Sequence, residues 1–462
     1  MPTWKKVSDF HYSASHLFSW HARNGAFVRL TPPWERIKII SWEGGEATQH
    51  LPPIEQYGDI SKGTQVKLQM KVGPFPLQFH AEHTDLQINS SFTDVQRKGP
   101  FAEWKHIHRF VPVTEQSSQM DDDIFFRMPL GFGNWFTRKK LEKTFSFRHQ
   151  RLQNDLDRHQ QFADKPRLKV AITGASGMIG RQLTAFLRTG GHQVFAMVRK
   201  KTDNPDDIFW SPQQVETEKL EGVDAVIHLA GETIASRWTK SKKQKIRESR
   251  TIGTKVLADA LASLNKPPKV FISASAIGIY GVSQHERFTE ESTLGNDFLA
   301  QVCKDWEASA ESARAAGIRV VHPRIGLVVT TAGGAVGKML LPFSLGLGGP
   351  VGSGKQWMSW IGLDDLLGVF YHCLYDSSIQ GPVNAVSPNA VQNKQFSSEL
   401  GRALRRPAFL PLPGFAVKLM FGEMGDSLLL QGANVLPSKL QASNFKWFYP
   451  KIEQALAFEC GS

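Results

Sequence analysis

The sequence predicts an α/β fold: a doubly wound parallel sheet with a C-terminal small subdomain, preceded by a separate α+β unit. A chain of 462 residues is too long for one ordinary core and suggests two or three domains. Its first part alternates short β-like runs with turns, whereas from about Leu168 apolar strands alternate with helical stretches, which is typical of a parallel sheet. We therefore expect domains over 1–161, 168–395 and 396–462, with a linker at 162–167.

Residues 1–161 are expected to form an antiparallel sheet closed by a long helix. Gln65–Val72 alternates polar and apolar residues with period two, and Leu86–Phe92 is a second β-like run. From about Thr137 to Gln161, apolar residues recur among charges at a spacing that gives one buried helix face, namely Leu141, Phe145, Leu152 and Leu156. A strongly curved sheet that grips this helix is the expected arrangement.

This first part also resembles the START-like ligand-binding superfamily of polyketide cyclases. The similarity rests on His-Tyr-Ser-Ala-Ser at 11–15 before an expected helix, and on Gly99–Trp104 leading into a strand. The resemblance implies a helix-grip fold whose interior binds a hydrophobic ligand, a lipid or an aromatic molecule.

Four histidines of this part are candidate metal ligands: His80, His83, His106 and His108. His106 and His108 would point the same way on a strand. No third ligand clusters with them in the sequence, so we predict no metal site and expect histidines on a sheet face.

After the linker, the chain shows the pattern of a dinucleotide-binding Rossmann unit. Leu168–Thr173 is an apolar strand, the glycine loop Gly174–Gly180 follows at once, and an amphipathic helix leads to a second strand at Gln193–Val198. This order of strand, loop, helix and strand predicts a site for the cofactor pyrophosphate. The expected contacts come from the loop and the helix that it opens: Gly174, Ser176, Gly177, Met178, Ile179 and Gly180.

The end of the second strand indicates which cofactor is bound. A site for NAD usually has a carboxylate there to bind the ribose hydroxyls, but this strand is followed by Arg199-Lys200-Lys201. A cation can pair with the 2′-phosphate of NADP(H), and the planar fork of Arg199 suits a phosphate best. The alternative is an ordinary exposed charge; we predict NADP(H).

Further motifs extend a family resemblance over about residues 168–458. They are His228–Glu232, Ser273–Ser275 with Tyr280-Gly281, Pro323–Gly326, Gln356–Ile361 and Asp364-Asp365, with Ala442–Phe445 near the end. Together they resemble the extended short-chain dehydrogenase/reductases, and among them the epimerase-like family. The resemblance implies further cofactor contacts from Leu229, Ala230, Gly231 and Glu232.

The sequence departs from that superfamily at its usual proton-transfer pair, Tyr-x-x-x-Lys, in which the lysine lowers the tyrosine pKa. The matching helix, Asp297–Glu307, places Leu299 and Cys303 at those two positions. Ser275 matches the superfamily's catalytic serine, and Tyr280 is a nearby phenol, so both are the catalytic candidates. Loop capping is the alternative role for Ser275.

Residues near the strands' carboxyl ends are candidates for a substrate cleft, where ligands of such sheets bind: Arg237, Trp238, Trp357, Ser359 and Trp360. Trp360 would equally suit an aromatic core, and Arg237 a solvated surface.

Composition excludes several other classes. The net charge of +12 is spread over both halves, so we expect anionic ligands and no nucleic acid. The chain shows no apolar run of membrane-spanning length and no apolar core of a signal peptide. Its three cysteines lie far apart, which favours a reducing, cytoplasmic location. The oligomeric state is not predicted.

The sequence leaves three functions open. The first is an NADP(H)-dependent oxidoreductase or epimerase-like enzyme acting on a carbonyl or sugar-like small-molecule substrate. The second, favoured by the replaced Tyr/Lys pair, is an NADP(H)-binding sensor or scaffold, which the names of some relatives link to cell division. A third places the function in the N-terminal interior.

Overall fold

The computed structural model describes residues 3–35, 37–44, 60–72, 75–129 and 133–462. The chain divides into two compact units, one made mainly of Met1–Gln161 and one mainly of residues 162–460. Among the described residues, no helix combines the length and the apolar character needed to cross a membrane.

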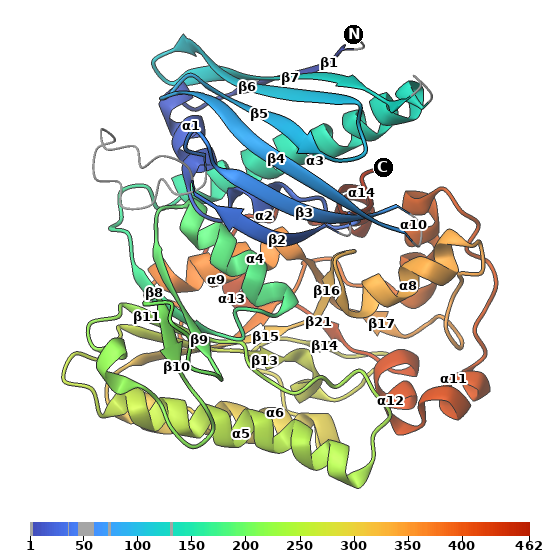
Figure 1. Cartoon of the computed structure of the whole chain (residues 1–462). Coiled ribbons are helices and arrows are strands. Elements are labelled where there is room, and N and C mark those ends of the chain that lie inside the picture. Colours follow the sequence, from blue (N-terminus) through green and yellow to red (C-terminus); the bar gives the residue numbers. More distant parts are fainter. Residues whose placement is uncertain (1–2, 36, 45–59, 73–74, 130–132) are drawn as a thin grey trace. The chain divides into compact units, whose positions relative to one another are not determined.

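The first unit is a seven-stranded antiparallel sheet in the order β1-β7-β6-β5-β4-β3-β2 (Figure 1). Its strands are β1 (Thr3–Phe10), β2 (Lys38–Glu43), β3 (Gln65–Val72), β4 (Phe75–Gln87), β5 (Ser91–Lys98), β6 (Glu103–Thr114) and β7 (Ser117–Arg127). Its helices are α1 (Ala14–Ala22), α2 (Ala26–Leu30) and the long α3 (Asn134–Gln160).

The predicted strand at Gln65–Val72 is confirmed as β3, and the predicted long helix is α3. All four of its predicted apolar residues are buried, because α3 turns that face toward the sheet and its neighbours. The strand predicted over Leu86–Phe92 is wrong as one continuous element: β4 ends at Gln87, β5 begins at Ser91, and a turn separates them. Asn89 lies in this turn at φ +60°, a left-handed conformation that asparagine tolerates, and Ser90 N–H donates to the Gln87 carbonyl.

The second unit is built on a parallel sheet in the order β10-β9-β8-β11-β12-β15, to which β19 and β13 add at β15. The strands are β8 (Lys169–Thr173), β9 (Gln193–Val198), β10 (Asp207–Phe209), β11 (Ala225–His228), β12 (Val270–Ser273), β13 (Ser275–Ala276), β15 (Arg319–Ile325) and β19 (Gly381–Ala385). The predicted doubly wound parallel sheet is confirmed.

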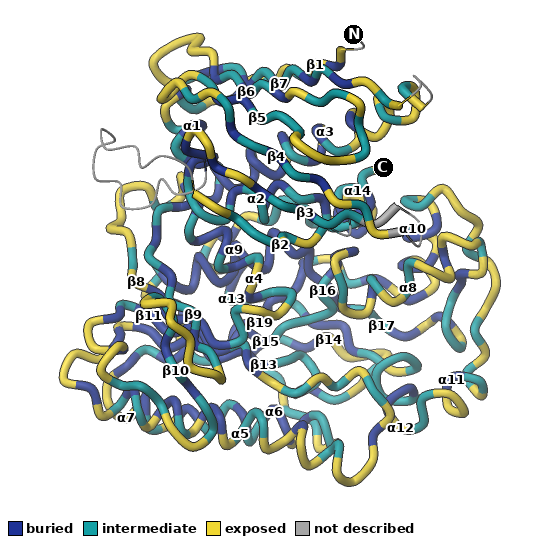
Figure 2. The backbone as a smooth tube through the Cα atoms, in the orientation of Figure 1, coloured by how far each residue is buried: buried dark blue, intermediate teal, exposed yellow. Residues whose placement is uncertain are grey.

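Helices cover both faces of this sheet, with α4 (Met178–Thr189) and α9 (Leu363–Tyr375) on one side and α5 (Lys240–Ala262) and α6 (Phe298–Ala308) on the other (Figure 1). The central strands are buried along their length, as near-continuous apolar sequence requires (Figure 2). The two helices α5 and α6 begin where Thr239 and Asp297 accept hydrogen bonds from backbone N–H groups of the first turn.

The C-terminal part of this unit is mostly helical. It contains α8 (Gly334–Ser344), α10 (Asn393–Leu404), α11 (Gly414–Phe421), α12 (Glu423–Gly425), α13 (Ser438–Ala442) and α14 (Ile452–Cys460), preceded by the short α7 (Glu311–Ala315). Two-stranded pairs link it to the preceding chain: β14 (Arg287–Phe288) with β21 (Asn434–Val435), β16 (Leu327–Val329) with β18 (Trp360–Gly362), and β17 (Trp357–Met358) with β20 (Val391–Gln392). Single-turn segments are η2 (Thr217–Leu220), η3 (Ile277–Tyr280) and the π-turn η4 (Asp426–Leu430).

Candidate functional site

The candidate site lies at the carboxyl ends of β8 and β11, where the strand order reverses. From β8 the chain continues to β9 and β10 on one side, and it returns to β11 and β12 on the other. In doubly wound sheets the loops on the two sides of such a point diverge, and ligands bind in the crevice between them.

The three glycines of the loop are required by its geometry. Gly174 has φ +70°, and a Cβ there would lie 3.0 Å from the Ala230 backbone nitrogen. A Cβ on Gly180 would lie 2.2 Å from the Gly174 carbonyl oxygen, and one on Gly177 would lie 3.2 Å from the same oxygen. The loop thus has no room for side chains at the positions where backbone must approach a ligand.

Helix α4 begins at Met178, directly after this loop, so the N–H groups of its first turn face the loop. Ser176 and Gly177 are exposed, whereas Met178 and Ile179 are half-buried. A helix N-terminus with exposed backbone in front of it is suited to a phosphate group.

The loop after β11 is fixed from both ends. The Thr173 hydroxyl oxygen accepts hydrogen bonds from Leu229 N–H at 3.1 Å and Ala230 N–H at 3.2 Å. Glu232 N–H donates to the Ser249 hydroxyl at 3.0 Å, and Arg250 donates to the Glu232 carbonyl at 3.0 Å. The backbone of Leu229–Glu232 is therefore preorganised beside the glycine loop.

His228, at the end of β11, is a buried partner of that arrangement. Its Nδ1 lies 2.7 Å from the Thr173 hydroxyl, and burial lowers the pKa of the imidazole to about 3. Because Thr173 already accepts two N–H groups, its own proton is the one donated to Nδ1. His228 is thus neutral at physiological pH and serves to orient Thr173.

Positive charge gathers at the end of β9. Arg199 is exposed directly after that strand. Lys242 forms an ion pair with Glu232, and this contact, together with the charges of Lys245 and Arg199, holds the pKa of the Glu232 carboxyl below its usual range. Three cations from β9 and α5 therefore surround the one carboxylate of this loop.

Ser275 and Tyr280 lie in a buried hydrogen-bond network. The Ser275 hydroxyl donates to Glu307 at 2.7 Å, and Arg324 binds the two oxygens of Glu307 at 2.9 Å each. Arg324 also donates to the Tyr280 hydroxyl at 2.8 Å, and that hydroxyl donates to Asn384 at 2.7 Å. Both candidate hydroxyls are engaged within the fold, and their catalytic role stays a prediction.

The electrostatics of this network are those of a buried ion pair. Burial alone would raise the pKa of Glu307, but the Arg324 guanidinium outweighs it and holds that pKa low. Burial raises the pKa of the Tyr280 hydroxyl, so the phenol is neutral near pH 7. Sequence reasoning missed Glu307, Arg324 and Asn384 as members of this network, although Arg324 stands within the motif Pro323–Gly326.

The positions of the usual Tyr/Lys pair are filled by apolar packing. Leu299 lies against Gly278, at 3.4 Å from where a Cβ on that glycine would be. Cys303 is buried with Ile279 and Tyr280, and burial raises its pKa to about 12. Neither side chain can exchange a proton near neutral pH.

The predicted cleft residues divide into two sets. Trp238, Ser359 and Trp360 are buried and bonded within the fold, through the Ile234 carbonyl, the Ala433 carbonyl and the Asn389 carbonyl respectively. Trp360 lies in the core formed by α8, α10 and α14.

Arg237 and Trp357 are the members of the set that retain exposure. Arg237 is exposed beside Gly422, and Trp357 is half-buried with its indole N–H on the Gln284 carbonyl. The contact of any of these five residues with substrate stays a prediction.

Comparison with known proteins gives the family context. Residues 170–384 match the profile of the NAD dependent epimerase/dehydratase family, and residues 412–459 match a domain of unknown function (DUF1731). An epimerase family protein of Mycobacterium bovis is 40% identical over 292 residues, which are 63% of this chain and 96% of the relative. The epimerase family protein SDR39U1 of Bos taurus is 38% identical over 296 residues, 63% of this chain and 98% of the relative.

Two solved structures extend the comparison. The nucleoside-diphosphate sugar epimerase from Corynebacterium glutamicum superposes with a TM-score of 0.80 at 32% identity, covering 99% of this chain and 90% of that one. Human epimerase family protein SDR39U1, solved with NADPH, superposes with a TM-score of 0.58 at 34% identity, covering 63% of this chain and 98% of that one. The link to cell division receives no support from these relatives.

Proposed function

The chain belongs to the epimerase family, and from this membership we propose that it binds NADP(H) at the crevice between β8 and β11. The observation that carries the proposal is the loop Gly174–Gly180, in which a Cβ at Gly174 or Gly180 would meet backbone atoms at 3.0 Å or less and one at Gly177 would meet the Gly174 carbonyl oxygen at 3.2 Å. Human SDR39U1, 34% identical, was solved with NADPH, which supports the same choice of cofactor.

Each part of the cofactor has residues here that fit it. The pyrophosphate would lie on the N–H groups of the glycine loop and of the first turn of α4. The 2′-phosphate would lie at Arg199, next to the further positive charges of Lys242 and Lys245. The backbone of Leu229–Gly231 would line the opposite wall, fixed there by Thr173.

We further propose that this chain is an oxidoreductase or epimerase-like enzyme for a carbonyl or sugar-like substrate. When bound, the nicotinamide supplies hydride exchange. Ser275 and Tyr280, on β13 and η3 beyond the carboxyl end of β12, are the hydroxyls of this chain proposed to orient a substrate oxygen. In that role the Ser275 hydroxyl would exchange its bond to Glu307 for one to substrate.

A second candidate is a protein that binds NADP(H) without turning over a substrate. The specific observation in its favour is the pairing of both candidate hydroxyls within the fold, together with Leu299 and Cys303 at the proton-transfer positions. The first unit would then be the part that responds to cofactor occupancy.

For the first unit, we propose a START-like ligand-binding fold. Its support is the seven-stranded antiparallel sheet with α1 and α2 inserted after β1 and the long α3 at its end. A hydrophobic ligand for it stays a prediction.

Cofactor binding is tested by titrating the purified chain with NADPH and with NADH, following the cofactor fluorescence. Arg199→Asp should weaken NADPH binding by about 10- to 150-fold, since one charge-assisted hydrogen bond contributes about 1.5–3 kcal/mol. NADH binding should change little. Lys266→Asp, an exposed cation near the amino end of β12 and so at the opposite sheet edge, is the matched control and should change neither. Equal losses of affinity for NADPH and NADH would contradict the 2′-phosphate assignment.

Turnover is tested separately, by following NADPH absorbance with panels of carbonyl compounds and nucleotide sugars. Oxidation of NADPH with reduction of one of the carbonyl compounds supports the enzyme. Conversion of a nucleotide sugar to its epimer, which leaves the NADPH absorbance unchanged and is followed by chromatography, supports it equally. Tight NADPH binding with no turnover across both panels supports the second candidate.

A further inference from the structure

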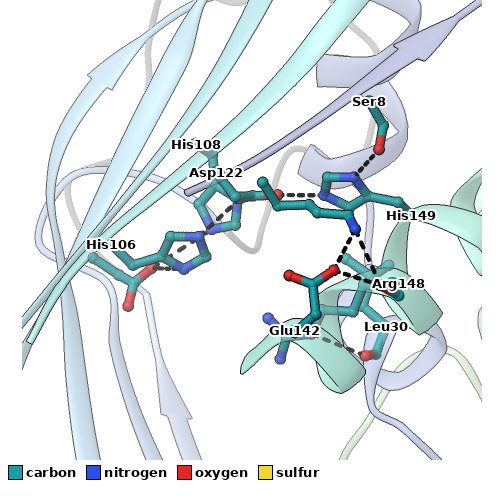
Figure 3. Close-up of polar contacts among 11 residues, drawn as sticks. Ser8, Leu30, His106, His108, Asp122, Glu142, Arg148 and His149 are labelled. Atoms are coloured by element: carbon teal, nitrogen blue, oxygen red, sulfur yellow. Dashed lines mark hydrogen bonds and ion pairs between the residues drawn. The ribbon is translucent and has the colours of Figure 1, made fainter. Parts of the chain in front are cut away.

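A group of histidines and aspartates lies on one face of the first unit's sheet. Strand register places His83 opposite Asp94 and Asp94 opposite His106, and in the next row it places His108 opposite Asp122. Residues directly opposite each other share a face, as do residues two apart on one strand, so these side chains are neighbours. His149 of α3 contacts the Asp122 carboxylate of this group (Figure 3).

The inner edge of the group has the dimensions of a metal site. Asp94 Oδ2 lies 3.3 Å from His106 Nδ1 and 3.6 Å from His108 Nε2. The three candidate ligand atoms all lie within 4.8 Å of one another. Tetrahedral bonds of about 2.0–2.1 Å to nitrogen and oxygen ligands put neighbouring ligand atoms about 3.3–3.4 Å apart.

On the outer edge of the group, Asp122 is hydrogen-bonded to His106 and lies close to His108. His106 Nε2 lies 2.8 Å and His108 Nδ1 lies 2.7 Å from the same oxygen of Asp122, which is fully buried. The other oxygen of Asp122 lies 2.6 Å from His149 Nε2, and His149 Nδ1 lies 2.7 Å from the Ser8 hydroxyl (Figure 3). A carboxylate behind a histidine is the usual support of a metal-binding imidazole, because it fixes the ring and its tautomer.

A second observation points to the same place. The His83 side chain is buried, with only 7% of its residue surface exposed, and it lies opposite Asp94 in the sheet. Its Nδ1 has no hydrogen-bond partner among the described residues. A buried imidazole nitrogen without a partner is costly unless something else binds it. His83 is therefore a buried donor next to Asp94, outside the group of three residues whose ligand atoms lie within 4.8 Å of one another.

We propose that Asp94, His106 and His108 bind a divalent transition-metal ion of the zinc type, with Asp122 positioning the His106 imidazole and His83 buried beside the group. Two imidazoles and one carboxylate form a ligand set that zinc accepts, with the fourth position left for another ligand or for water. This site lies in the first unit and does not depend on the proposed cofactor site.

The test titrates the chelator-treated full chain with Zn²⁺ against a chromogenic chelator. The wild-type chain should take up one Zn²⁺, and Asp94→Asn and His108→Gln should each weaken binding by at least about 100-fold, beyond the 10- to 100-fold that loss of a supporting partner costs. His80→Gln is the matched control, since His80 lies on the same strand but on the opposite face from His83, and it should bind as wild type does.

Co²⁺ binding to the wild-type chain provides a second readout that does not depend on whether the variants fold. It should give the visible d–d bands of nitrogen and oxygen ligands without the thiolate charge-transfer band that the buried Cys303, Cys373 and Cys460 would add. Less than one Zn²⁺ per chain, thiolate-dominated Co²⁺ spectra, or folded ligand variants that bind as tightly as wild type would each overturn the proposal and leave a hydrogen-bonded His–Asp network.

Discussion

Replacing Glu307 by glutamine tests whether the Ser275–Tyr280 network is a structural ion pair. Glu307 accepts two hydrogen bonds from Arg324 and one from Ser275, and the Arg324 side chain is only 4% exposed. Glutamine has nearly the same shape but no charge, and its amide N–H₂ would face one guanidinium nitrogen. Loss of one partner of a buried pair leaves the other charge uncompensated, so we expect a loss of about 3–5 kcal/mol in unfolding free energy.

The assay is urea unfolding of the full chain, with the midpoint of the second unit's transition as the readout. Glu311→Gln is the control, because its ion pair with Arg314 is exposed and should contribute at most about 1 kcal/mol. In a double-mutant cycle, adding Arg324→Gln to Glu307→Gln should cost less than the sum of the single variants, since the two residues share one interaction. A loss for Glu307→Gln no larger than that of Glu311→Gln would refute the reasoning.

Two further predictions concern the loops of the cofactor site. Gly180→Ala should weaken NADPH binding by at least about tenfold, because its Cβ would meet the Gly174 carbonyl oxygen at 2.2 Å. The control Gly337→Ala, whose Cβ would have no atom closer than 3.5 Å, should bind NADPH as the wild-type chain does. Equal NADPH affinities of the two variants, measured by fluorescence titration, would contradict this role of the loop geometry. His228 has a folded pKa of about 3, below its unfolded value of about 6.5, so the unfolded chain binds more protons and stability is lost as pH falls from 6.5 toward 3. By pH 5 this loss should reach about 2 kcal/mol relative to pH 7.5, and it should be missing in His228→Asn; a variant with the same pH slope as wild type would contradict the assignment.

Much of the second unit could be predicted from sequence because its determinants are local. The glycine loop, the apolar strand before it and the helix after it occupy consecutive residues, and their order alone fixes a Rossmann unit. The turn at Asn89 could not be seen in the same way. Its neighbours Leu86, Ile88 and Phe92 suit a strand, and one left-handed residue outweighed their propensity.

The two clusters that sequence reasoning missed are assembled by strand pairing. Ser275 lies opposite Arg324 through the pairing of β13 with β15, although the two residues are far apart in the chain. Asp94, the third potential ligand beside His106 and His108, comes from the neighbouring strand β5. Such partners become visible only once the register is known, because a one-residue slip would turn each side chain to the other face.

Cofactor binding and turnover place different demands on this chain. The proposed binding site depends on backbone N–H groups, on three positions without a Cβ and on a cation after β9, and all of these are present. Proton transfer instead requires side chains of suitable pKa, and at the two positions of the usual pair Leu299 and a cysteine with a pKa of about 12 have joined the apolar core. If Ser275 or Tyr280 orients a substrate oxygen, as proposed, it must leave bonds that also stabilise the fold. A substrate that releases Ser275 from Glu307 must therefore supply a comparable hydrogen bond, which favours an oxygen-rich, sugar-like compound over an apolar carbonyl.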